Sequence, residues 1–469
     1  MVFTVVSAAL LAGCTVGPKY VRPATEVPSD YKEAAEFKTA QPRDDIAKGK
    51  WWEAYGDAEL NSLEEQVTLA NQSLKAAADR FEQARAAIRI NRAPLFPSVT
   101  AGASASQNRQ SQNRALSSIN SPINYTDFQL PVDVSYEPDL WGRVRRSVEA
   151  ARSEAQATAA DLANVGLSLH AELAADYFQL RGLDSQKQLL DSTVIAYQRA
   201  FDLTNSRYQG GIASAVDVAQ AQTQLETTRA QDQDVEVQRS AFEHAIAVLA
   251  GKPPSELAVA PMPLGAPPPA IPPGLPSDLL ERRPDIAAAE RRMQEANAQI
   301  GVARAAYFPS ITLAGSGGFE SNHIGNLLEG PSGLWSLAGS AAELLFDGGA
   351  RRGVSDQARA AFNQSVDNYR QTTLTAFQEV EDNLSALRVL QTEAQTQQAA
   401  VSAAEHSLDL SNSRYKGGVA NYLEVTTAQS AALSDERAAV DILTRRMTAS
   451  VLLVKALGGG WNVSQIPAL

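Results

Sequence analysis

Two long stretches of this chain contain no proline and consist largely of strong helix formers. They run from about Arg145 to Tyr208 and from Arg352 to Tyr415, and Ala, Gln, Leu, Glu and Arg dominate both. A continuous helix of about 60 residues would be about 90 Å long, which no compact domain can house. Apolar residues recur at three- and four-residue spacing, and many of them are alanine, which lets helices approach closely. The sequence therefore predicts long helices in coiled-coil-like packing.

The same stretches end in a repeated motif. Residues 205–222 read NSRYQGGIASAVDVAQAQ and residues 412–429 read NSRYKGGVANYLEVTTAQ, 207 positions apart (412 − 205). Repetition on this scale indicates two copies of one supersecondary unit. Each half is predicted to run helix, FPS, Ser/Gly/Ala-rich stretch, long helix, NSRY-x-GG and a further helix.

Other parts of the repeat support this division. FPS occurs at 96–98 and again at 308–310, and Arg145-Arg146 aligns with Arg351-Arg352. Between the halves, residues 251–276 contain too many prolines for a helix or a central strand. This segment is predicted to be an extended linker.

The segments that follow each FPS have the period of a β-strand. SVTAGASASQ and FQLPVDVSY alternate apolar and polar residues over about ten positions, the length of a membrane-spanning strand. SITLAGSGGF repeats the pattern from Ser310, and LWSLAGSAAELLF (334–346) repeats it less regularly. Aromatic residues near the strand ends suit a membrane interface. Two β-hairpins in lipid are predicted, against the alternative of a soluble hairpin with one face on a core.

Four strands cannot close a barrel, so the hairpins would need strands from elsewhere. Open strand edges in hydrocarbon leave N–H and C=O groups unpaired, at several kcal/mol each. If the strands span the membrane, other copies of the chain must supply the missing ones. The sequence has no run of about 18 apolar residues that would predict a transmembrane helix.

The N-terminus reads as an export signal with a lipid anchor. The chain opens MVFTVVSAALLAGC, an apolar stretch ending in small residues, as signal peptides do. Leu11 to Cys14 resemble the lipobox of bacterial lipoproteins, in which the cysteine becomes the first residue and carries a diacylglyceryl group. The residue after it is Thr15 rather than Asp, consistent with an outer-membrane address. The alternative is a lone buried cysteine.

Several motifs in sequence order resemble the outer membrane factor family, the TolC-like exit ducts of tripartite efflux pumps. They are WWEAYGDAELNSLEEQ, the doubled FPS, LLERRPDIAAAE, LFDGG and the doubled NSRY-x-GG. CTVGPKYVRPATEVP is similar to the NodT-type lipoprotein branch of that family, and the resemblance covers essentially residues 11–460. It implies a homotrimer in which four strands per chain form one shared barrel and the helices continue it as a periplasmic tunnel. The implied partners are a periplasmic adaptor, an inner-membrane pump of the RND type, and outer-membrane lipid.

The fold class expected is thus mainly α with a membrane β-barrel, built from an internal tandem repeat. The expected parts are a signal peptide (1–13), a lipidated extended segment (14–50), first-repeat helices (51–95), a first transmembrane β-hairpin (96–137), a first long helical hairpin (143–250), the linker (251–276), second-repeat helices (277–307), a second transmembrane β-hairpin (308–347), a second long helical hairpin (350–457) and a C-terminal tail (458–469).

The repeated motif predicts the turn at the end of each helical hairpin. Gly210-Gly211 and Gly417-Gly418 are expected to supply the positive φ that ends a helix. Ser214 with Asp217, and Asn421 with Glu424, have the spacing of capping boxes. Two hairpins per chain need the same turn signals, which explains the repetition as local structure.

The resemblance adds functional roles at these two tips. It implies adaptor docking by Arg207, Tyr208, Gly210, Gly211, Arg414, Tyr415, Gly417 and Gly418. It also implies a pore gate, where an acidic ring would favour cations; the candidates are Glu424, Leu423, Tyr422 and Thr427 at the second tip and Asp217 at the first. The alternative for Glu424 is a purely structural capping role.

Other function classes find little support. The net charge of −12 argues against nucleic acid. The four histidines are scattered, no HExxH pair or GxxxxGK[ST] loop occurs, and no cofactor, metal site or catalytic residue is predicted. The leading hypothesis is a passive outer-membrane exit duct for small molecules, anchored at Cys14. The alternatives are a duct for type I protein secretion and a non-conducting coiled-coil lipoprotein.

Overall fold

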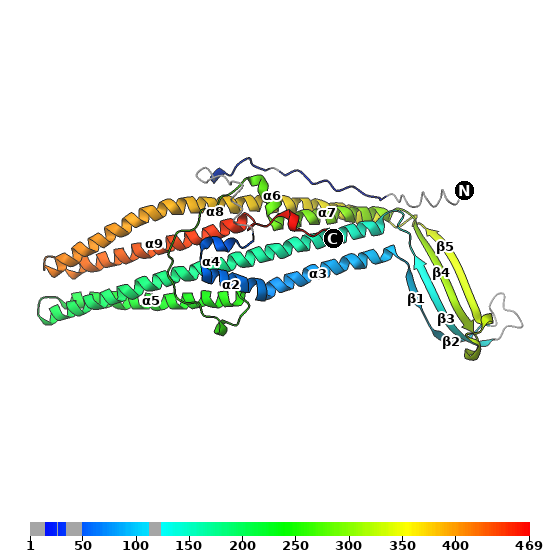
Figure 1. Cartoon of the computed structure of the whole chain (residues 1–469), viewed down its shortest axis with the longest axis horizontal. Coiled ribbons are helices and arrows are strands. Elements are labelled where there is room, and N and C mark those ends of the chain that lie inside the picture. The colour runs from blue at the N-terminus through cyan, green and yellow to red at the C-terminus, as the bar shows by residue number, and fades with distance from the viewer. Residues whose placement is uncertain (1–14, 26, 34–48, 112–122) are drawn as a thin grey trace.

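The molecule is elongated, with long helices along most of its length and a β-sheet projecting from one end (Figure 1). The computed structural model describes residues 15–25, 27–33, 49–111 and 123–469. Its α-helices are α2 (Ala58–Ala70), α3 (Gln72–Arg92), α4 (Arg143–Gln209), α5 (Ala215–Leu249), α6 (Leu279–Arg282), α7 (Pro284–Ala305), α8 (Ala350–Lys416) and α9 (Tyr422–Ala456). Helices α4 and α8 have 67 residues each, which confirms the two long helices.

The two repeats correspond element by element. Helices α8 and α9 begin 207 positions after α4 and α5 (350 − 143 and 422 − 215), and α7 begins 212 positions after α3 (284 − 72). The 207-residue offset places Arg145 opposite Arg352 and Arg146 opposite Gly353. The alignment of Arg145-Arg146 with Arg351-Arg352 is therefore wrong by one position.

The sheet is antiparallel and has open edges on both sides. Its order is β1–β3–β4–β5, with β2 also paired to β3. The strands are β1 (Ser98–Ala101), β2 (Ser104–Arg109), β3 (Asn124–Tyr136), β4 (Ser310–Ser321) and β5 (Gly333–Ala342). Strands β1 and β2 form one edge and β5 forms the other, so each edge has backbone groups without a partner strand in this chain.

The first predicted strand is interrupted at Gly102. Strands β1 and β2 keep one register with β3, since Ala101 lies opposite Val132 and Ser104 opposite Gln129. Pro131 lies between those partners and has no N–H to donate, although its carbonyl still accepts from the Gly102 N–H at 3.0 Å. The interruption is thus a missing ladder hydrogen bond and not a change of register.

The register confirms that the sheet has one apolar and one polar face. Val134 of β3 lies opposite Val99 of β1 and Gly315 of β4, and Gly315 lies opposite Leu337 of β5. The alternate positions are mostly Ser, Thr, Asp and Ala, as in the pairing of Thr100 with Asp133. Leu337 is 80 % exposed in the single chain, so the apolar face is uncovered.

The fourth strand is shorter than the sequence predicts. The strand expected over 334–346 ends at Ala342, because β4 begins at Ser310, the partner of Ala342, and offers nothing further to pair with. Leu345 and Phe346 are left 88 % and 86 % exposed between β5 and α8.

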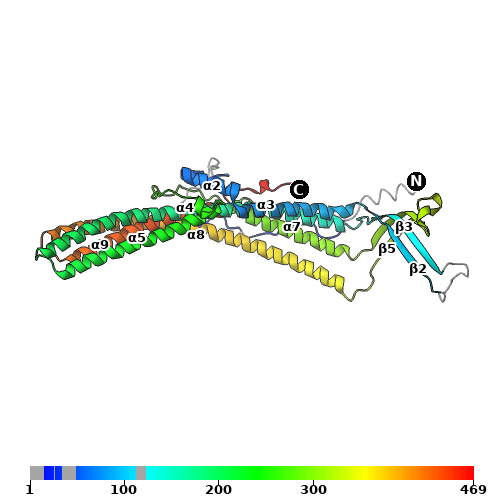
Figure 2. The same ribbon diagram turned by 90° about the horizontal axis from the view of Figure 1, so that it is seen from below.

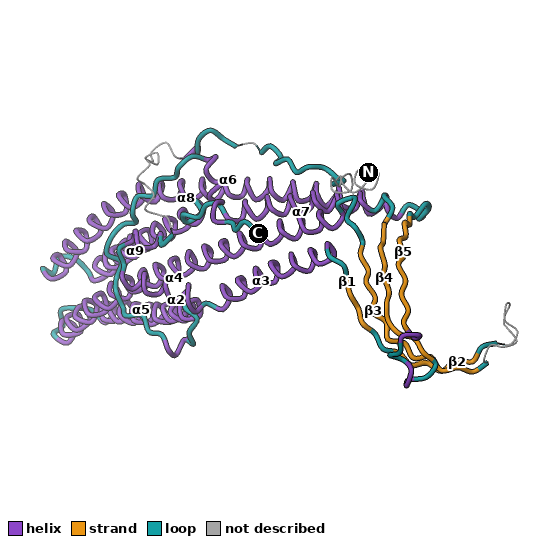
Figure 3. The backbone as a smooth tube through the Cα atoms, turned by 45° about the vertical axis from the view of Figure 1, so that its right-hand side comes forward, coloured by secondary structure: helices purple, strands orange, loops and turns teal. Residues whose placement is uncertain are grey.

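Strands β1, β3, β4 and β5 each adjoin a long helix at the end of the sheet nearest the bundle, and these helices keep the order of the strands (Figure 3). Helices α3, α4, α7 and α8 contact one another in that sequence, matching β1, β3, β4 and β5. Away from the sheet, α4 packs on α5 and α8 packs on α9 as two helical hairpins that lie side by side in both ribbon views (Figure 2). The bundle therefore has open edges at α3 and α8, in line with the open edges of the sheet.

Among the described residues, no helix is both long enough and apolar enough to cross a membrane.

Candidate functional site: the helical tips and the central network

Both tips turn through the same backbone motif. The Ile212 N–H donates to the Arg207 carbonyl at 2.8 Å, and the Val419 N–H donates to the Arg414 carbonyl at 3.0 Å, as in a Schellman motif. Gly211 and Gly418 have φ of 74° and 77°, where glycine is favoured.

Only the second glycine of each pair has this role. Gly210 and Gly417 have φ of −79° and −75°, which other residues adopt readily. The expectation that both glycines of a pair supply positive φ is therefore wrong for the first of each.

The two tips differ in how their second helix is capped. At the first tip, the Ser214 side chain accepts from the Asp217 N–H, and the Asp217 carboxylate accepts from the Ser214 N–H at 2.9 Å. At the second tip, Asn421 accepts from the Glu424 N–H, but no return bond from Glu424 is formed. The Glu424 carboxylate instead lies 3.3 Å from the Arg414 guanidinium. The capping box is complete in the first repeat only, which leaves Glu424 available for another role.

Arg207 joins the two hairpins. Its guanidinium donates to the Tyr415 carbonyl at 2.9 Å and lies over the Tyr415 ring at 4.7 Å from the centroid. Tyr415 and Tyr422 form an edge-to-face pair at 5.2 Å and are only 7 % and 2 % exposed. These two tyrosines are thus core residues of the second tip. Tyr415 is thus not the exposed residue that the sequence predicts, and Tyr422 is buried beside it.

Each tip instead presents exposed apolar side chains that the sequence analysis mostly missed. Ile212 and Val419 are 72 % and 70 % exposed, and Val216 and Leu423 occupy equivalent exposed positions one turn further on. Only Leu423 was predicted, as a gate residue. The missed signal was the 207-residue offset, which pairs Ile212 with Val419 (419 − 212) and Val216 with Leu423 (423 − 216).

The remaining predicted tip residues are placed as follows. Arg414, Gly417, Gly418, Gly210, Gly211, Tyr208 and Thr427 are exposed, whereas Arg207 and Asp217 are half-buried. Thr427 donates its hydroxyl to the Leu423 carbonyl at 2.8 Å. At the second tip, Arg414 at the end of α8 thus lies beside Glu424 at the start of α9, next to the exposed Leu423 and Thr427.

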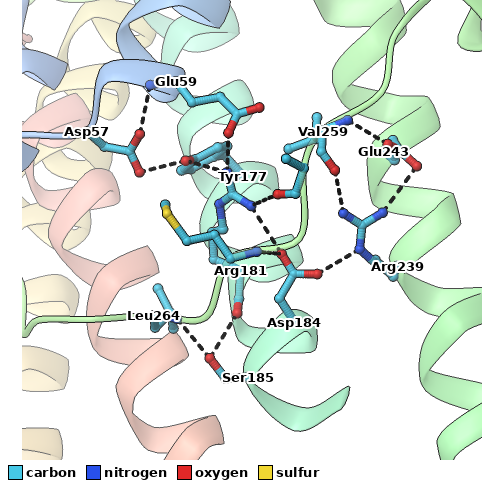
Figure 4. Close-up of polar contacts among 12 residues, drawn as sticks. Asp57, Glu59, Tyr177, Arg181, Asp184, Ser185, Arg239, Glu243, Val259 and Leu264 are labelled. Carbon is cyan, nitrogen blue, oxygen red and sulfur yellow. Dashed lines mark hydrogen bonds and ion pairs between the residues drawn. The ribbon is translucent and has the colours of Figure 1, made fainter. Parts of the chain in front are cut away.

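A buried arginine organises the middle of the molecule (Figure 4). Arg181 of α4 is 1 % exposed and donates to Asp184, to Glu59 at 2.6 Å and to the Tyr177 hydroxyl at 2.9 Å. It also donates to the Ala260 carbonyl of the proline-rich linker. Arg181 therefore ties three segments together: α2, α4 and the linker.

A second arginine extends this network to α5 (Figure 4). Arg239 donates to Asp184 at 2.7 Å and to the Val259 carbonyl at 2.6 Å. The Leu264 N–H donates to the Ser185 hydroxyl at 2.8 Å. The linker is thus held across α4 and α5 by its backbone groups, which its sequence did not indicate.

A buried acid–base pair lies beside this network. The Glu64 carboxyl is 2.6 Å from the His170 Nδ1, and the His170 ring stacks on Trp52 at 4.5 Å between centroids. Burial raises the pKa of Glu64 to about 9 and lowers the pKa of His170 to about 4. Both shifts favour the uncharged pair, in which a protonated carboxyl donates to the imidazole, over a carboxylate–imidazolium ion pair.

Cys14, the predicted lipid attachment site, lies outside the described residues. The segment that follows it is docked against the junction between sheet and helices. The Val16 N–H donates to the Trp141 carbonyl at 3.1 Å, and the Arg146 guanidinium donates to the carbonyls of Val16 and Pro18 at 3.2 and 3.1 Å. Within the described part of the chain, no group of three or more His, Cys, Asp or Glu side chains could hold a metal ion.

A sheet with one apolar face, joined strand by strand to long helices that end in exposed tips, defines a membrane duct with a long extramembrane extension. The family model described as outer membrane efflux protein matches residues 63–252 and 275–459. The chain belongs to the outer membrane efflux protein family. It is an outer-membrane exit duct of an efflux system, with a large periplasmic part, which confirms the predicted outer-membrane exit duct.

Individual relatives match over nearly the whole chain. The outer membrane protein OprJ of Pseudomonas aeruginosa is 35 % identical over 456 residues, which cover 96 % of this chain and 94 % of OprJ. A toluene efflux pump outer membrane protein, TtgC of Pseudomonas putida, is 33 % identical over 97 % of this chain and 94 % of its own length. Among solved structures, the outer-membrane channel OprN has a TM-score of 0.89 at 30 % identity, covering 96 % of this chain and 100 % of OprN.

Proposed function

We propose that three copies of this chain form one duct that conducts small molecules passively across the outer membrane. The observation that carries this proposal is the open sheet, in which the β1/β2 edge and the β5 edge are unpaired and one face is apolar. Unpaired edges in lipid are costly, so neighbouring copies complete the sheet. The open helix edges at α3 and α8 are completed in the same way.

The tips are proposed as the docking site for a periplasmic adaptor that links the duct to an inner-membrane pump of the RND type. Four exposed apolar side chains, Ile212, Val216, Val419 and Leu423, support this role, because such residues favour burial against a partner. Arg207 and Gly211 act indirectly, by holding the turns in place. The lipid anchor at Cys14 is proposed to fix the docked N-terminal segment to the outer membrane.

Charged substitutions at the tips should abolish efflux without dismantling the duct. We expect Ile212→Asp combined with Val419→Asp to weaken adaptor binding by about 2 kcal/mol or more, since each places a carboxylate in an apolar contact. Drug susceptibility of cells and adaptor crosslinking measure the effect. Val21→Asp, at a position that is 76 % exposed and outside the tips, is the control. Normal efflux and crosslinking by the double variant would contradict docking at these residues.

Glu424 is proposed to line the pore at the second tip. Its carboxylate accepts no hydrogen bond from the Asn421 N–H and pairs instead with Arg414, near the exposed Leu423. Three copies would form a ring of carboxylates that favours cations. We expect Glu424→Ala to raise conductance or weaken cation preference in planar bilayers, with Glu65→Ala as a control far from the tip. Unchanged conductance and selectivity would show that Glu424 does not line the gate.

A further inference from the structure

The contact between the two repeats inside one chain, here called the seam, predicts the contact between two copies. Within the chain, β3 and α4 of the first repeat lie against β4 and α7 of the second. Between copies, β5 and α8 of the second repeat would lie against β1 and α3 of the next chain. This contact between copies rests on the proposed trimer, and the repeat specifies which residues meet in it.

The 207- and 212-residue offsets between the repeats predict which residues meet between two copies. Tyr136 lies opposite Leu313 in the β3·β4 pair. Adding 207 to the first position and subtracting 212 from the second gives Glu343 opposite Ala101 of the next copy. The same register places Ser340 opposite Ser104, and both belong to the polar face. Odd-numbered positions meet odd-numbered positions, so the apolar side of β5 meets the apolar side of β1 and β2, with Glu343 at its end.

This register gives the exposed segment after β5 a partner. Residues 343–346 have no strand beside them within the chain, and Leu345 and Phe346 are almost fully exposed. In the inferred register they face residues 98–101 of the next copy, beside Phe96, which is 61 % exposed. The fourth strand would thereby extend to Phe346, as its sequence predicts.

The helices supply an independent match. Within the chain, Arg146 of α4 packs on Gly301 of α7, where an added Cβ would lie 2.9 Å from the Arg146 side chain. The position equivalent to Arg146 in the second repeat is Gly353 (146 + 207), and the position equivalent to Gly301 in the first repeat is Arg89 (301 − 212). The same pair of residue types is therefore found at the equivalent positions, with the arginine and the glycine exchanged between the helices.

Both members of this second pair are free in the single chain. Gly353 has open space where its Cβ would be, and Arg89 is exposed and forms no ion pair with any described residue. We propose that Arg89 of one copy packs over Gly353 of the next, with β5 joined to β1/β2 in the register that pairs Ser340 with Ser104.

Exchanging the two side chains tests the helix contact. We expect Gly353→Arg alone to reduce the trimer fraction in detergent at least tenfold, because two arginines then occupy one contact. Adding Arg89→Gly to the same chain recreates the Arg146–Gly301 arrangement and should restore the trimer to within twofold of the unmodified protein. Light scattering after size exclusion measures both. Gly353→Ala is the control and should assemble normally, because the added methyl group displaces only a flexible side chain.

Paired cysteines test the strand register. Ser340→Cys with Ser104→Cys should give covalent trimers under mild oxidation, whereas Ser340→Cys with Thr100→Cys should not, since Thr100 lies about 13 Å further along the strand on the same face. The single variants control for Cys14. A trimer that survives Gly353→Arg and crosslinks through Thr100 would overturn this seam while leaving the trimer intact. An unmodified protein that is monomeric would overturn the proposed function itself.

Discussion

Arg181→Ala is expected to destabilise the protein by about 3–5 kcal/mol, because it leaves buried acceptors without their charged donor. Arg181 is 1 % exposed and serves Asp184, Glu59, Tyr177 and the Ala260 carbonyl. Asp184 keeps its bond to Arg239, but the Ala260 carbonyl loses its charged donor. Urea unfolding in detergent, followed by circular dichroism, measures the change in the free energy of unfolding.

A surface arginine provides the matched comparison for this experiment. Arg85 forms an ion pair with Glu82 at 2.6 Å, and its side chain is 45 % exposed. Arg85→Ala should cost at most about 1 kcal/mol, because exposed ion pairs contribute little. Equal effects of the two substitutions would show that the Arg181 network does not hold α2, α4 and the linker together.

Glu64→Gln is expected to make the protein more stable than the unmodified chain at alkaline pH. The pKa of Glu64 is raised to about 9 in the folded state from 4.5, so above pH 4.5 the folded state holds a proton that the unfolded state has lost. Stability falls as pH rises wherever the folded state binds more protons. Between pH 6.5 and 8.5 the fall is on the order of 3 kcal/mol.

His170 determines how the free energy of unfolding changes with pH below about pH 6.5. Its pKa is lowered to about 4 from 6.5, so between these values the unfolded state binds the extra proton and stability falls as pH falls. The two contributions cancel between about pH 4.5 and 6.5, which gives the unmodified protein a plateau there. The amide introduced by Glu64→Gln cannot lose a proton, so the stability of this variant should be flat above pH 6.5 and fall below it.

Unfolding curves at pH 5.5 and 8.5 distinguish these profiles. Glu65→Gln is the matched control, because Glu65 is the neighbouring residue on α2 and its side chain is 58 % exposed. The control should follow the unmodified protein at both pH values. If Glu64→Gln gives no gain at pH 8.5, the carboxyl is ionised in the folded state and the proton lies on His170.

Local sequence patterns were sufficient for the elements of this fold. The long helices, the apolar and polar sides of the sheet, and the Schellman turns at Gly211 and Gly418 follow from short-range spacing. Each depends on interactions between residues close in sequence or on the alternation of a strand, so one sequence contains the information. The repeat also predicted that the second half would copy the first, and α4 and α8 have equal lengths.

At the tips, local sequence patterns do not predict the tertiary contacts. Arg207 and Arg414 stand in the same motif, yet Arg207 contacts Tyr415 of the other hairpin and Arg414 pairs with Glu424 of its own. Equivalent positions in a repeat have equivalent local structure but different neighbours. The shared motif therefore predicted an exposed Tyr415 like Tyr208, although Tyr415 is buried under Arg207 and against Tyr422.

By itself, the sequence determined the repeat, the helices and most of the strand positions, because these depend on spacing along the chain, and its motifs carried the resemblance to the family. Only the tertiary structure decided that Arg181 and the Glu64–His170 pair are buried, that the linker lies across α4 and α5, and that Gly353 and Arg89 are free at open edges. Burial and neighbourhood arise from packing between segments up to hundreds of residues apart, and no spacing rule encodes which of two equivalent side chains will find a partner.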